Sequence, residues 1–261
     1  MKKFTPLFLI FFFICTSGFA DDPHPTGFSI IKKQRDLQKG YSDFTATGTL
    51  LLKNREGELD TKRMFTFTEI ESSKDVNGKI LIKINFPPDL SGTGLLSLAQ
   101  PNNQTNQYLY LSALKQTKQI VSAARGGRFL GSEFFYEDLV PYSWQSYDYD
   151  SQGEATIAGR PCYIVKLIPH ETLQSLYGKI LYYIDKEKLI TLQTDFYSKK
   201  DEWIKSASFE NHEKLAGQFL RPLKITMLNK LTGRSSELNL TDVKIKNGLN
   251  PDTINLGALE R

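Results

Sequence analysis

The chain has few of the residues that build metal sites, disulfide frameworks or proton-transfer centres. Its 261 residues include two cysteines, three histidines and two tryptophans. Two cysteines, Cys15 and Cys162, exclude a multi-disulfide framework and a four-cysteine zinc site. Neither a His-Glu-x-x-His helix nor a Gly-x-Ser-x-Gly elbow occurs. We therefore expect no metal, no cofactor and no enzymatic activity.

The sequence also has no large excess of positive or negative charge. The sequence has 33 Lys and Arg against 29 Asp and Glu, a formal charge of +4. A nucleic-acid-binding chain would concentrate cationic charge, so we expect no nucleic-acid partner. Apolar residues make up 40%, which excludes an intrinsically disordered chain. The length would allow two domains, but all-β domains of this size are common.

The first twenty residues have the pattern of a secretory signal peptide. Met1–Lys3 is a basic head, Pro6–Ile14 is apolar, and Gly18–Ala20 places small residues where a signal peptidase cleaves. The apolar run is short for an uncleaved membrane anchor, and Ile14 before Cys15 does not fit a lipoprotein signal. We expect cleavage after Ala20, leaving residues 21–261 as one domain.

Cleavage would leave Cys162 as the single cysteine, so an internal disulfide is excluded. This cysteine stands in a strand-like run, Cys162–Val165. We expect a small buried apolar side chain and not a catalytic thiol.

Most of the chain reads as an antiparallel sheet. Phe28–Lys39 has the spacing of an amphipathic helix that ends near Gly40. Ile80, Ile82 and Ile84 alternate with more polar residues, as on a sheet with one covered face. Ten strands are expected: Thr45–Lys53, Arg63–Ile70, Lys79–Phe86, Tyr108–Leu111, Cys162–Ile168, Lys179–Ile184, Leu189–Tyr197, Trp203–Phe209, Leu223–Leu228 and Glu237–Ile245. They fit a closed or half-closed sheet of ten or more strands.

The stretch from Pro87 to Pro141 is irregular, and long loops on a rigid sheet are where function is expected. Arg125–Arg128 is either an exposed hairpin or a site for a phosphate or lipid headgroup. Glu133, Glu137 and Asp138 are expected to stay solvated or to cap a short helix, and Gly131 to form a turn.

The sequence is rich in aromatic residues, with 12 Tyr and 17 Phe. Ordinary packing between strands explains such residues, and so does an apolar ligand cavity. The composition alone leaves both interpretations open.

Several segments resemble the LolA-like family of outer-membrane lipoprotein-sorting proteins. The most specific is the Phe-Leu-Gly-Ser…Tyr-Glu-Asp-Leu string within Gly127–Leu139. The other matching segments are Phe86–Leu96, Tyr108–Lys115, Gly159–Tyr163, Pro222–Met227 and Asn229–Gly233. The sequence departs mildly from the family pattern, with Tyr108 for Trp, Ser112 for Pro, Glu133 for Asp, and Lys115 and Lys118 for Arg. These departures concern cargo or partner preference.

The resemblance implies a mainly β, single-domain, half-open antiparallel β-barrel with short helices against its concave face. It also implies a periplasmic carrier whose apolar cavity takes the acyl chains of a lipoprotein or lipid for transfer towards the outer membrane. An inner-membrane exporter would be the donor and an outer-membrane protein the acceptor. Expected cavity residues are Phe65, Phe67, Tyr108, Tyr110, Phe134 and Phe135, with Arg125 and Arg128 at the rim for a headgroup or exporter.

A second interpretation belongs to another class of function. The same sheet would serve as a docking or sensing surface of an exporter or envelope-stress system, without carrying cargo. Lipid that copurifies with the protein would separate the two.

Overall fold

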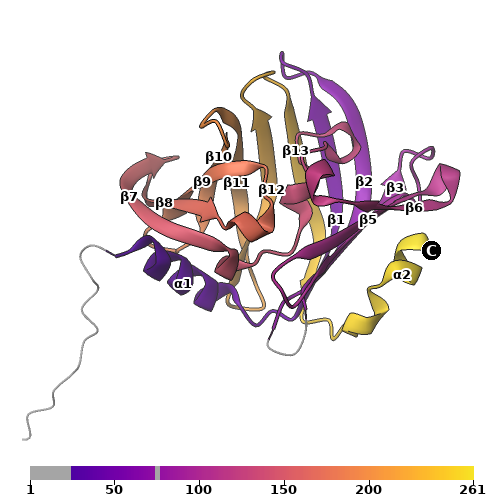
Figure 1. Cartoon of the computed structure of the whole chain (residues 1–261), viewed down its shortest axis with the longest axis horizontal. Helices are drawn as coiled ribbons and strands as arrows, with labels where there is room; N and C mark the ends of the chain where they lie inside the picture. The colour runs from indigo at the N-terminus through magenta and orange to yellow at the C-terminus, as the bar shows by residue number, and fades with distance from the viewer. Residues whose placement is uncertain (1–24, 74–76) are drawn as a thin grey trace, which may run out of the picture.

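The structure is a computed structural model that describes residues 25–73 and 77–261. The expected signal peptide and its cleavage site lie outside these residues. The described chain is mainly β, with thirteen strands in one antiparallel sheet (Figure 1). The strands are β1 (Asp43–Lys53), β2 (Leu59–Ile70), β3 (Lys79–Phe86), β4 (Gly94–Ala99), β5 (Thr105–Leu111), β6 (Gln116–Ile120), β7 (Tyr147–Ile157), β8 (Arg160–Pro169), β9 (Tyr177–Asp185), β10 (Thr191–Ser198), β11 (Trp203–Leu215), β12 (Phe219–Asn229) and β13 (Ser235–Ile245).

The sheet is open. Its strand order is β6-β5-β4-β3-β2-β1-β13-β12-β11-β10-β9-β8-β7, so β6 and β7 are the two edges and β1 pairs with β13 in the middle. A half-open architecture is therefore confirmed, and the closed alternative is wrong.

All ten expected strands are present, and three further strands were missed. β4 follows a glycine-rich turn and consists of three Leu with one Gly, one Ser and one Ala, none of which is a strong strand former. The edge strands β6 and β7 are largely exposed and polar. An edge strand that buries little needs no apolar alternation, so periodicity cannot find it.

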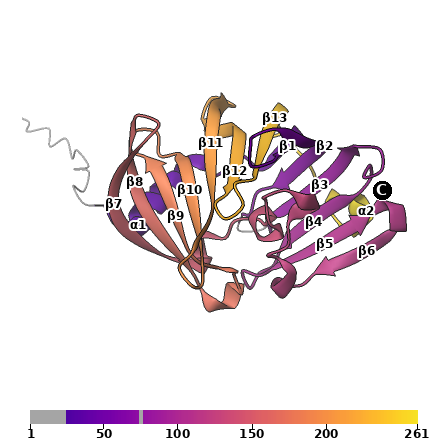
Figure 2. The same ribbon diagram turned by 90° about the horizontal axis from the view of Figure 1, so that it is seen from above.

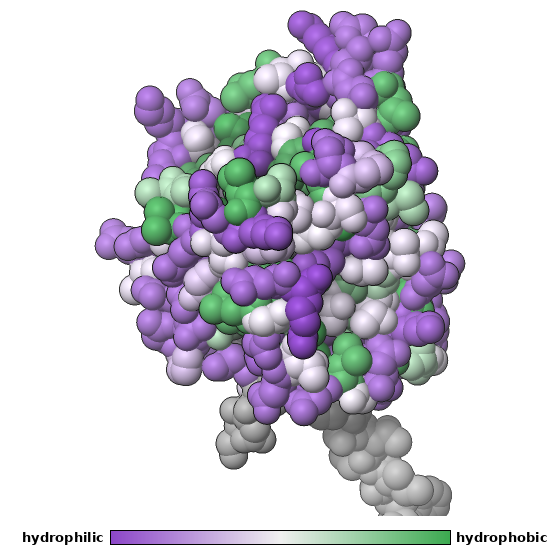
Figure 3. Space-filling view, turned by 90° about the vertical axis from the view of Figure 1, so that its right-hand side faces the viewer, coloured by the Kyte–Doolittle hydropathy of each residue, from purple (hydrophilic) through white to green (hydrophobic). Residues whose placement is uncertain are grey.

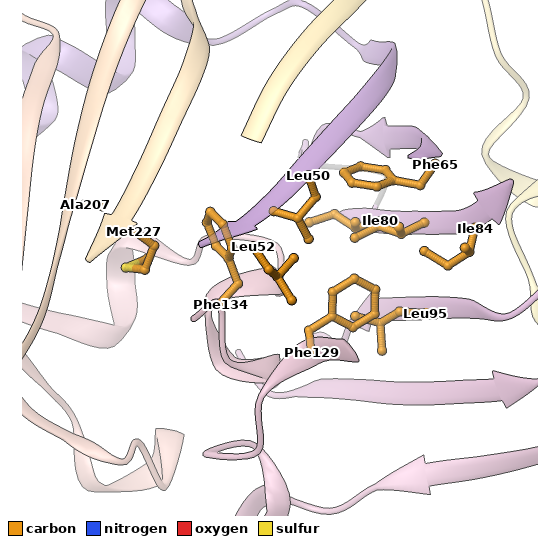
Figure 4. Packing of buried hydrophobic residues seen from close by; sticks show 11 residues of the cluster. Leu50, Leu52, Phe65, Ile80, Ile84, Leu95, Phe129, Phe134, Ala207 and Met227 are labelled. Atoms are coloured by element: carbon orange, nitrogen blue, oxygen red, sulfur yellow. The ribbon is translucent and has the colours of Figure 1, made fainter. Parts of the chain in front are cut away.

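The two faces of the sheet carry different apolar clusters. Leu50, Phe65, Ile84 and Leu95 lie in one cluster together with Met227 from the far half of the sheet (Figure 4). We call this side, around which the sheet curves, the inner face. On the opposite, outer face, another cluster is formed by Ile70, Leu81, Leu96, Ile254 and Leu259.

Helix α1 (Gly27–Gln38) covers one end of the inner face, close to the expected span. The hydroxyl of Thr26 accepts a hydrogen bond from the Ser29 amide at 3.1 Å and caps the helix. Ile30 and Ile31 are buried against a cluster on β8 and β9. Figures 1 and 2 show the helix crossing beneath β7–β12.

The connection from β6 to β7, residues 121–146, must pass from one edge of the sheet to the other. We call it the inner segment, because it crosses the inner face between the two halves of the sheet (Figure 2). It contains short 3-10 helices, among them Phe129–Gly131 and Tyr136–Leu139.

The C-terminal residues cover one part of the outer face, that of β2–β5. Ile254 and Leu259, the latter in helix α2 (Leu256–Glu260), pack on β3–β5. On the side of the molecule that carries β6 and α2, apolar residues are scattered among hydrophilic ones (Figure 3). No helix within residues 25–73 and 77–261 is long and apolar enough to cross a membrane.

Candidate functional site: the inner face and its cavity

Aromatic side chains of the inner segment fill the middle of the inner face. Phe129 and Phe134 are buried against Leu52, Leu95 and Met227 (Figure 4). Leu130, Tyr136 and Leu139 pack around the same cluster. The inner segment thus occupies the apolar surface that a ligand on this face would contact.

A tight hairpin shapes this part of the segment. The Phe129 amide donates to the Phe134 carbonyl at 2.8 Å, and Arg128 and Phe135 form an isolated β-bridge. Gly131 has φ +78°, a conformation that suits glycine, so the expected turn is confirmed. The hydroxyl of Ser132 donates to the Phe129 carbonyl at 2.7 Å and closes the turn.

A buried ion pair ties the segment to β11. Lys205 is 1% exposed, and its ammonium donates to the Asp138 carboxylate and lies 3.6 Å from the centre of the Phe135 ring. The same carboxylate accepts hydrogen bonds from the Tyr177 hydroxyl and the Phe135 amide, both at 2.7 Å. Burial lowers the pKa of Lys205, and the charge of Asp138 opposes that shift.

Two further carboxylates anchor the segment. Glu133 is 2% exposed and accepts from the Asn229 amide at 2.8 Å, with Arg128 at 3.3 Å. Glu137 accepts from the Ser175 hydroxyl and from the Leu176 amide, and burial raises its pKa. The expectation that Glu133, Glu137 and Asp138 stay solvated is wrong, because all three pair with polar groups of the strands and loops packed against the segment. The alternative, that they cap a short helix, is confirmed for Asp138, which accepts from the Phe135 amide at the start of Tyr136–Leu139.

The segment is also tied to the other half of the sheet. The Gln107 amide donates to the Tyr136 carbonyl at 2.8 Å, and the Ser97 hydroxyl donates to the Leu139 carbonyl at 2.7 Å. The Arg125 guanidinium donates to the Thr105 carbonyl. Both halves of the curved sheet therefore hold the inner segment. We call its aromatic part, residues 125–139, the strap.

A cavity of about 930 Å³ lies beside the strap, towards one end of the inner face. It is bounded by α1, the β4–β5 turn, residues 141–145 and parts of β10–β12, namely Thr191, Thr194, Phe209, His212 and Leu220–Pro222. Its apolar walls include Ile31, Trp144, Tyr182 and Phe209. Phe209 also packs against the cluster around Phe129, so the cavity and the aromatic strap share a wall. The volume lies in the range of about 300–1,000 Å³ that is typical of small-molecule sites.

The cavity has a polar end. Glu69 accepts a hydrogen bond from the Tyr41 hydroxyl at 2.7 Å, and burial raises the pKa of Glu69. Arg221 donates to Gln38 at 2.7 Å and its guanidinium lies 4.6 Å from the Tyr41 ring centre. Burial lowers the pKa of His212, which favours the neutral imidazole.

The structure separates the six expected cavity residues. Phe65 and Phe67 lie on the inner face, and Phe134 and Phe135 of the strap pack on clusters of that face. Tyr108 and Tyr110 pack in the outer cluster with Ile254 and Leu259. They do not share a surface with the other four, because strand alternation directs them to the opposite side of β5, and we leave them out of the site proposed below.

The two expected rim arginines are engaged with the chain itself. Arg125 bonds to Thr105, and Arg128 lies beside Glu133. A role for either in headgroup or exporter contact stays a prediction. Cys162 is buried with Ile190 and Leu192, as expected, and burial raises the pKa of its thiol.

Sequence reasoning missed the walls of the cavity. Glu69 has the same strand parity as Phe65 and Phe67, and Tyr182 the same parity as Ile180 and Ile184. Alternation along a recognised strand would therefore have placed both on the covered face. Trp144 stands in an irregular stretch and gave no such signal.

Solved structures share this architecture. A domain named for outer membrane lipoprotein sorting, from Vibrio parahaemolyticus, is 29% identical with a TM-score of 0.84, over 90% of this chain and 98% of that one. A DUF1329 family protein from Desulfovibrio piger is 23% identical with a TM-score of 0.82, over 89% and 97%. A LolA superfamily protein from Nitrosomonas europaea is 16% identical with a TM-score of 0.68, over 89% and 98%.

A search of curated proteins finds no significant match. The profile of a family described as uncharacterised protein matches residues 77–261, which is most of the chain. The chain belongs to that family, and its fold is the open, LolA-like sheet of the outer membrane lipoprotein-sorting proteins.

Proposed function

We propose that the protein is a periplasmic carrier that takes up acyl chains of a lipoprotein or lipid on its inner face. The observation that carries this proposal is an aromatic strap on the concave face beside a cavity of about 930 Å³. The likeness to a domain named for outer membrane lipoprotein sorting supports the same class of cargo. The role needs no catalytic residue.

The cavity would receive the first part of the acyl chain. The aromatic side chains of the strap would be displaced by the remainder of the acyl chain. An acyl chain of about 16 carbons gains roughly 13 kcal/mol on leaving water, at ~0.8 kcal/mol per methylene. A carrier must also release its cargo, so part of this gain has to be offset. Displacing Phe129 and Phe134 from their contacts with Leu52 and Leu95 would supply that offset. The buried carboxylates would keep the strap attached while its aromatic side chains move.

The proposal includes a route through the envelope. Residues 1–20 would be removed as a signal peptide, and residues 21–261 would form the carrier domain. An inner-membrane exporter would hand over the acylated cargo and an outer-membrane acceptor would receive it. Lipid extraction and mass spectrometry of protein purified from periplasm without detergent would identify the cargo.

Trp144 offers a direct test of acyl binding. It lines the cavity, and the chain has only one other tryptophan, so Trp203→Phe leaves Trp144 as the single reporter. In delipidated protein, a palmitoylated peptide should change Trp144 emission with saturation, and its unacylated twin should not. Absence of any response to the acylated peptide, together with no acyl ligand by mass spectrometry, would reject the carrier.

A matched pair of variants tests whether the acyl chain binds on the inner face of the sheet. Phe67 and Thr66 are neighbours on β2 that point to opposite faces. Phe67→Asp should weaken acyl binding by at least about tenfold, because an unpaired charge on the binding surface is costly to bury. Thr66→Asp should leave it unchanged. Circular dichroism of both variants must match the wild type before the affinities are compared.

The alternative is a docking or sensing module that carries no cargo. The strap fills the inner face with buried, hydrogen-bonded groups, which is compatible with a face that never opens. Failure of acyl binding in folded, delipidated protein would favour this alternative.

A further inference from the structure

The polar end of the cavity offers hydrogen-bonding atoms that the described chain does not use. Glu69 uses one carboxylate oxygen to accept from Tyr41, and the other has no hydrogen bond within the described residues. The same holds for the Gln38 amide nitrogen, whose side-chain oxygen accepts from Arg221, and for the Tyr182 hydroxyl. Gln104 and Gln145 line the same space. These atoms are a mixed set of donors and acceptors.

The charges around this space are largely compensated by the protein. Lys39 pairs with Asp36 at 2.8 Å, and Arg35 lies over the Trp144 ring at 4.8 Å. Glu71 accepts from the amides of Gly40 and Ser42 at 2.8–2.9 Å. Arg221 donates to Gln38 and is near enough to Glu69 for the two opposite charges to interact, so the cations Arg35, Lys39 and Arg221 are balanced by Asp36, Glu69 and Glu71. An ionic headgroup would find few free counter-charges here, whereas hydroxyl groups would find free amide and phenol groups.

Aromatic rings complete the lining. Tyr182 and Phe209 border the cavity from β9 and β11, and Tyr142 borders it from the inner segment. The C–H face of a sugar ring packs on aromatic side chains, while its hydroxyls exchange hydrogen bonds with amides and carboxyls. Apolar walls with a few placed polar groups are the usual composition of a site that orients one ligand.

We propose that the polar end of the cavity recognises an uncharged, hydroxyl-rich headgroup, that of a glycolipid or polyol lipid, attached to the acyl chain. This inference rests on the proposed carrier function and names the class of its cargo. Tyr182 and Glu69 would hydrogen-bond to the hydroxyls of the headgroup. The acyl chain of the lipid would extend past Phe209 towards the strap.

Amphiphiles with one chain and different headgroups test the proposal. The probes are dodecyl maltoside, dodecylphosphocholine, dodecyltrimethylammonium and dodecanoate, each below its micelle-forming concentration, with free maltose as a chainless control. Binding is followed by Trp144 emission in the Trp203→Phe protein and by titration calorimetry. Dodecyl maltoside should bind about tenfold more tightly than the other three, which corresponds to one or two additional hydrogen bonds.

The outcomes separate this inference from the carrier itself. Equal affinities for all four amphiphiles, or a preference for a charged or zwitterionic headgroup, would overturn the headgroup inference and leave the carrier standing. Binding of none would overturn the carrier. Maltose binding as tightly as dodecyl maltoside would support the sugar site and count against the acyl chain.

Conservative variants locate the headgroup. Tyr182→Phe removes one hydroxyl, and Glu69→Gln keeps an oxygen that can accept from Tyr41. Each should lower the preference for dodecyl maltoside by about threefold or more and leave the affinity for dodecylphosphocholine within about twofold. Tyr110→Phe, on the outer face, is the control and should change neither. A maltoside preference that survives in both cavity variants would place the headgroup elsewhere and overturn the assignment.

Discussion

Both faces of the sheet are covered by a segment that follows a strand, but the two coverings are built differently. The C-terminal residues cover the outer face of β2–β5 with Ile254 and Leu259. Their polar contacts to the sheet are hydrogen bonds: Lys79 donates to the Pro251 carbonyl at 2.6 Å, and the buried Asp43 carboxylate accepts from the Gly248 amide at 3.0 Å. The strap on the inner face adds the buried ion pair Lys205–Asp138 and two further carboxylates, the buried Glu133 and the half-buried Glu137. An arrangement that separates a buried ion pair leaves an unpaired charge at a high cost, so the ion pair restricts the inner covering to one position more strictly than apolar packing would.

The cavity lies on the inner side, next to the covering that has these polar anchors. In the proposed carrier, anchors of this kind would hold the backbone of the strap while its aromatic side chains are displaced. The outer covering has only to stay closed. The comparison predicts that changes to the inner covering affect ligand exchange and that changes to the outer covering affect stability alone.

Lys205→Met should have the largest effect on stability. It leaves the Asp138 carboxylate buried without its cation, which costs about 3–5 kcal/mol of the free energy of unfolding. Adding Asp138→Asn removes the unpaired charge and should recover more than half of the loss. Urea denaturation of the three proteins measures both changes, and a loss below about 1 kcal/mol in the single variant would contradict a structural role for the pair.

Phe129→Ala and Leu259→Ala compare the two coverings directly. Both side chains are buried, so each truncation should cost about 2–5 kcal/mol. Phe129→Ala should also bind an acyl ligand about tenfold more tightly, because less aromatic surface must be displaced. Leu259→Ala should keep wild-type affinity. Equal affinities in the two variants would remove the functional distinction between the faces.

Gly131→Val tests the turn of the strap. Gly131 and Gly153 both have positive φ, at +78° and +94°, and neither has a close neighbour that a side chain would strike. Valine at either position should therefore cost about 1–3 kcal/mol through backbone strain. Only Gly131→Val should also slow release of an acylated ligand. Thermal melts and a release assay on both proteins separate the two effects.

Cys162→Ser should cost about 1–2 kcal/mol, because a buried hydroxyl replaces a thiol that packs with Ile190 and Leu192. Acyl binding should change by less than about twofold, since Cys162 itself does not line the cavity and reaches it only through its neighbour Ile190. A folded variant that has lost acyl binding would show that the thiol has a function beyond packing.

The smallest expected effect is a pH dependence from Glu137. Burial raises its pKa above the ordinary value of 4.5, so the folded state binds a proton more readily than the unfolded state. Its contribution to stability is complete below pH 4.5 and declines as the pH rises through the raised pKa. The wild type should therefore lose stability relative to Glu137→Gln between pH 4.5 and neutrality. Denaturation of both proteins at several pH values measures the difference, and a constant difference would contradict the raised pKa.

Local chemistry determined the strands that alternate and the first helix. Ile80, Ile82 and Ile84 placed β3 without a structure, because side chains of a strand point to its two faces in turn. The predictions of a buried thiol at Cys162 and of a turn at Gly131 were also correct, since each depends on residues close in the sequence. The family resemblance, and not the periodicity, supplied the half-open architecture.

Only the tertiary structure decided which groups meet across the sheet. From the sequence, Glu133, Glu137 and Asp138 were expected to be solvated or to cap a short helix. Their burial depends on Lys205, Asn229 and Ser175, which lie far along the chain. Alternation showed that Tyr110 and Leu109 face opposite sides of β5, but not which side is covered by the strap and which by the C-terminus. Alternation with a period of two separates the two faces of a strand but does not show which face is concave. The curvature that makes one face concave arises from the twist of all thirteen strands together.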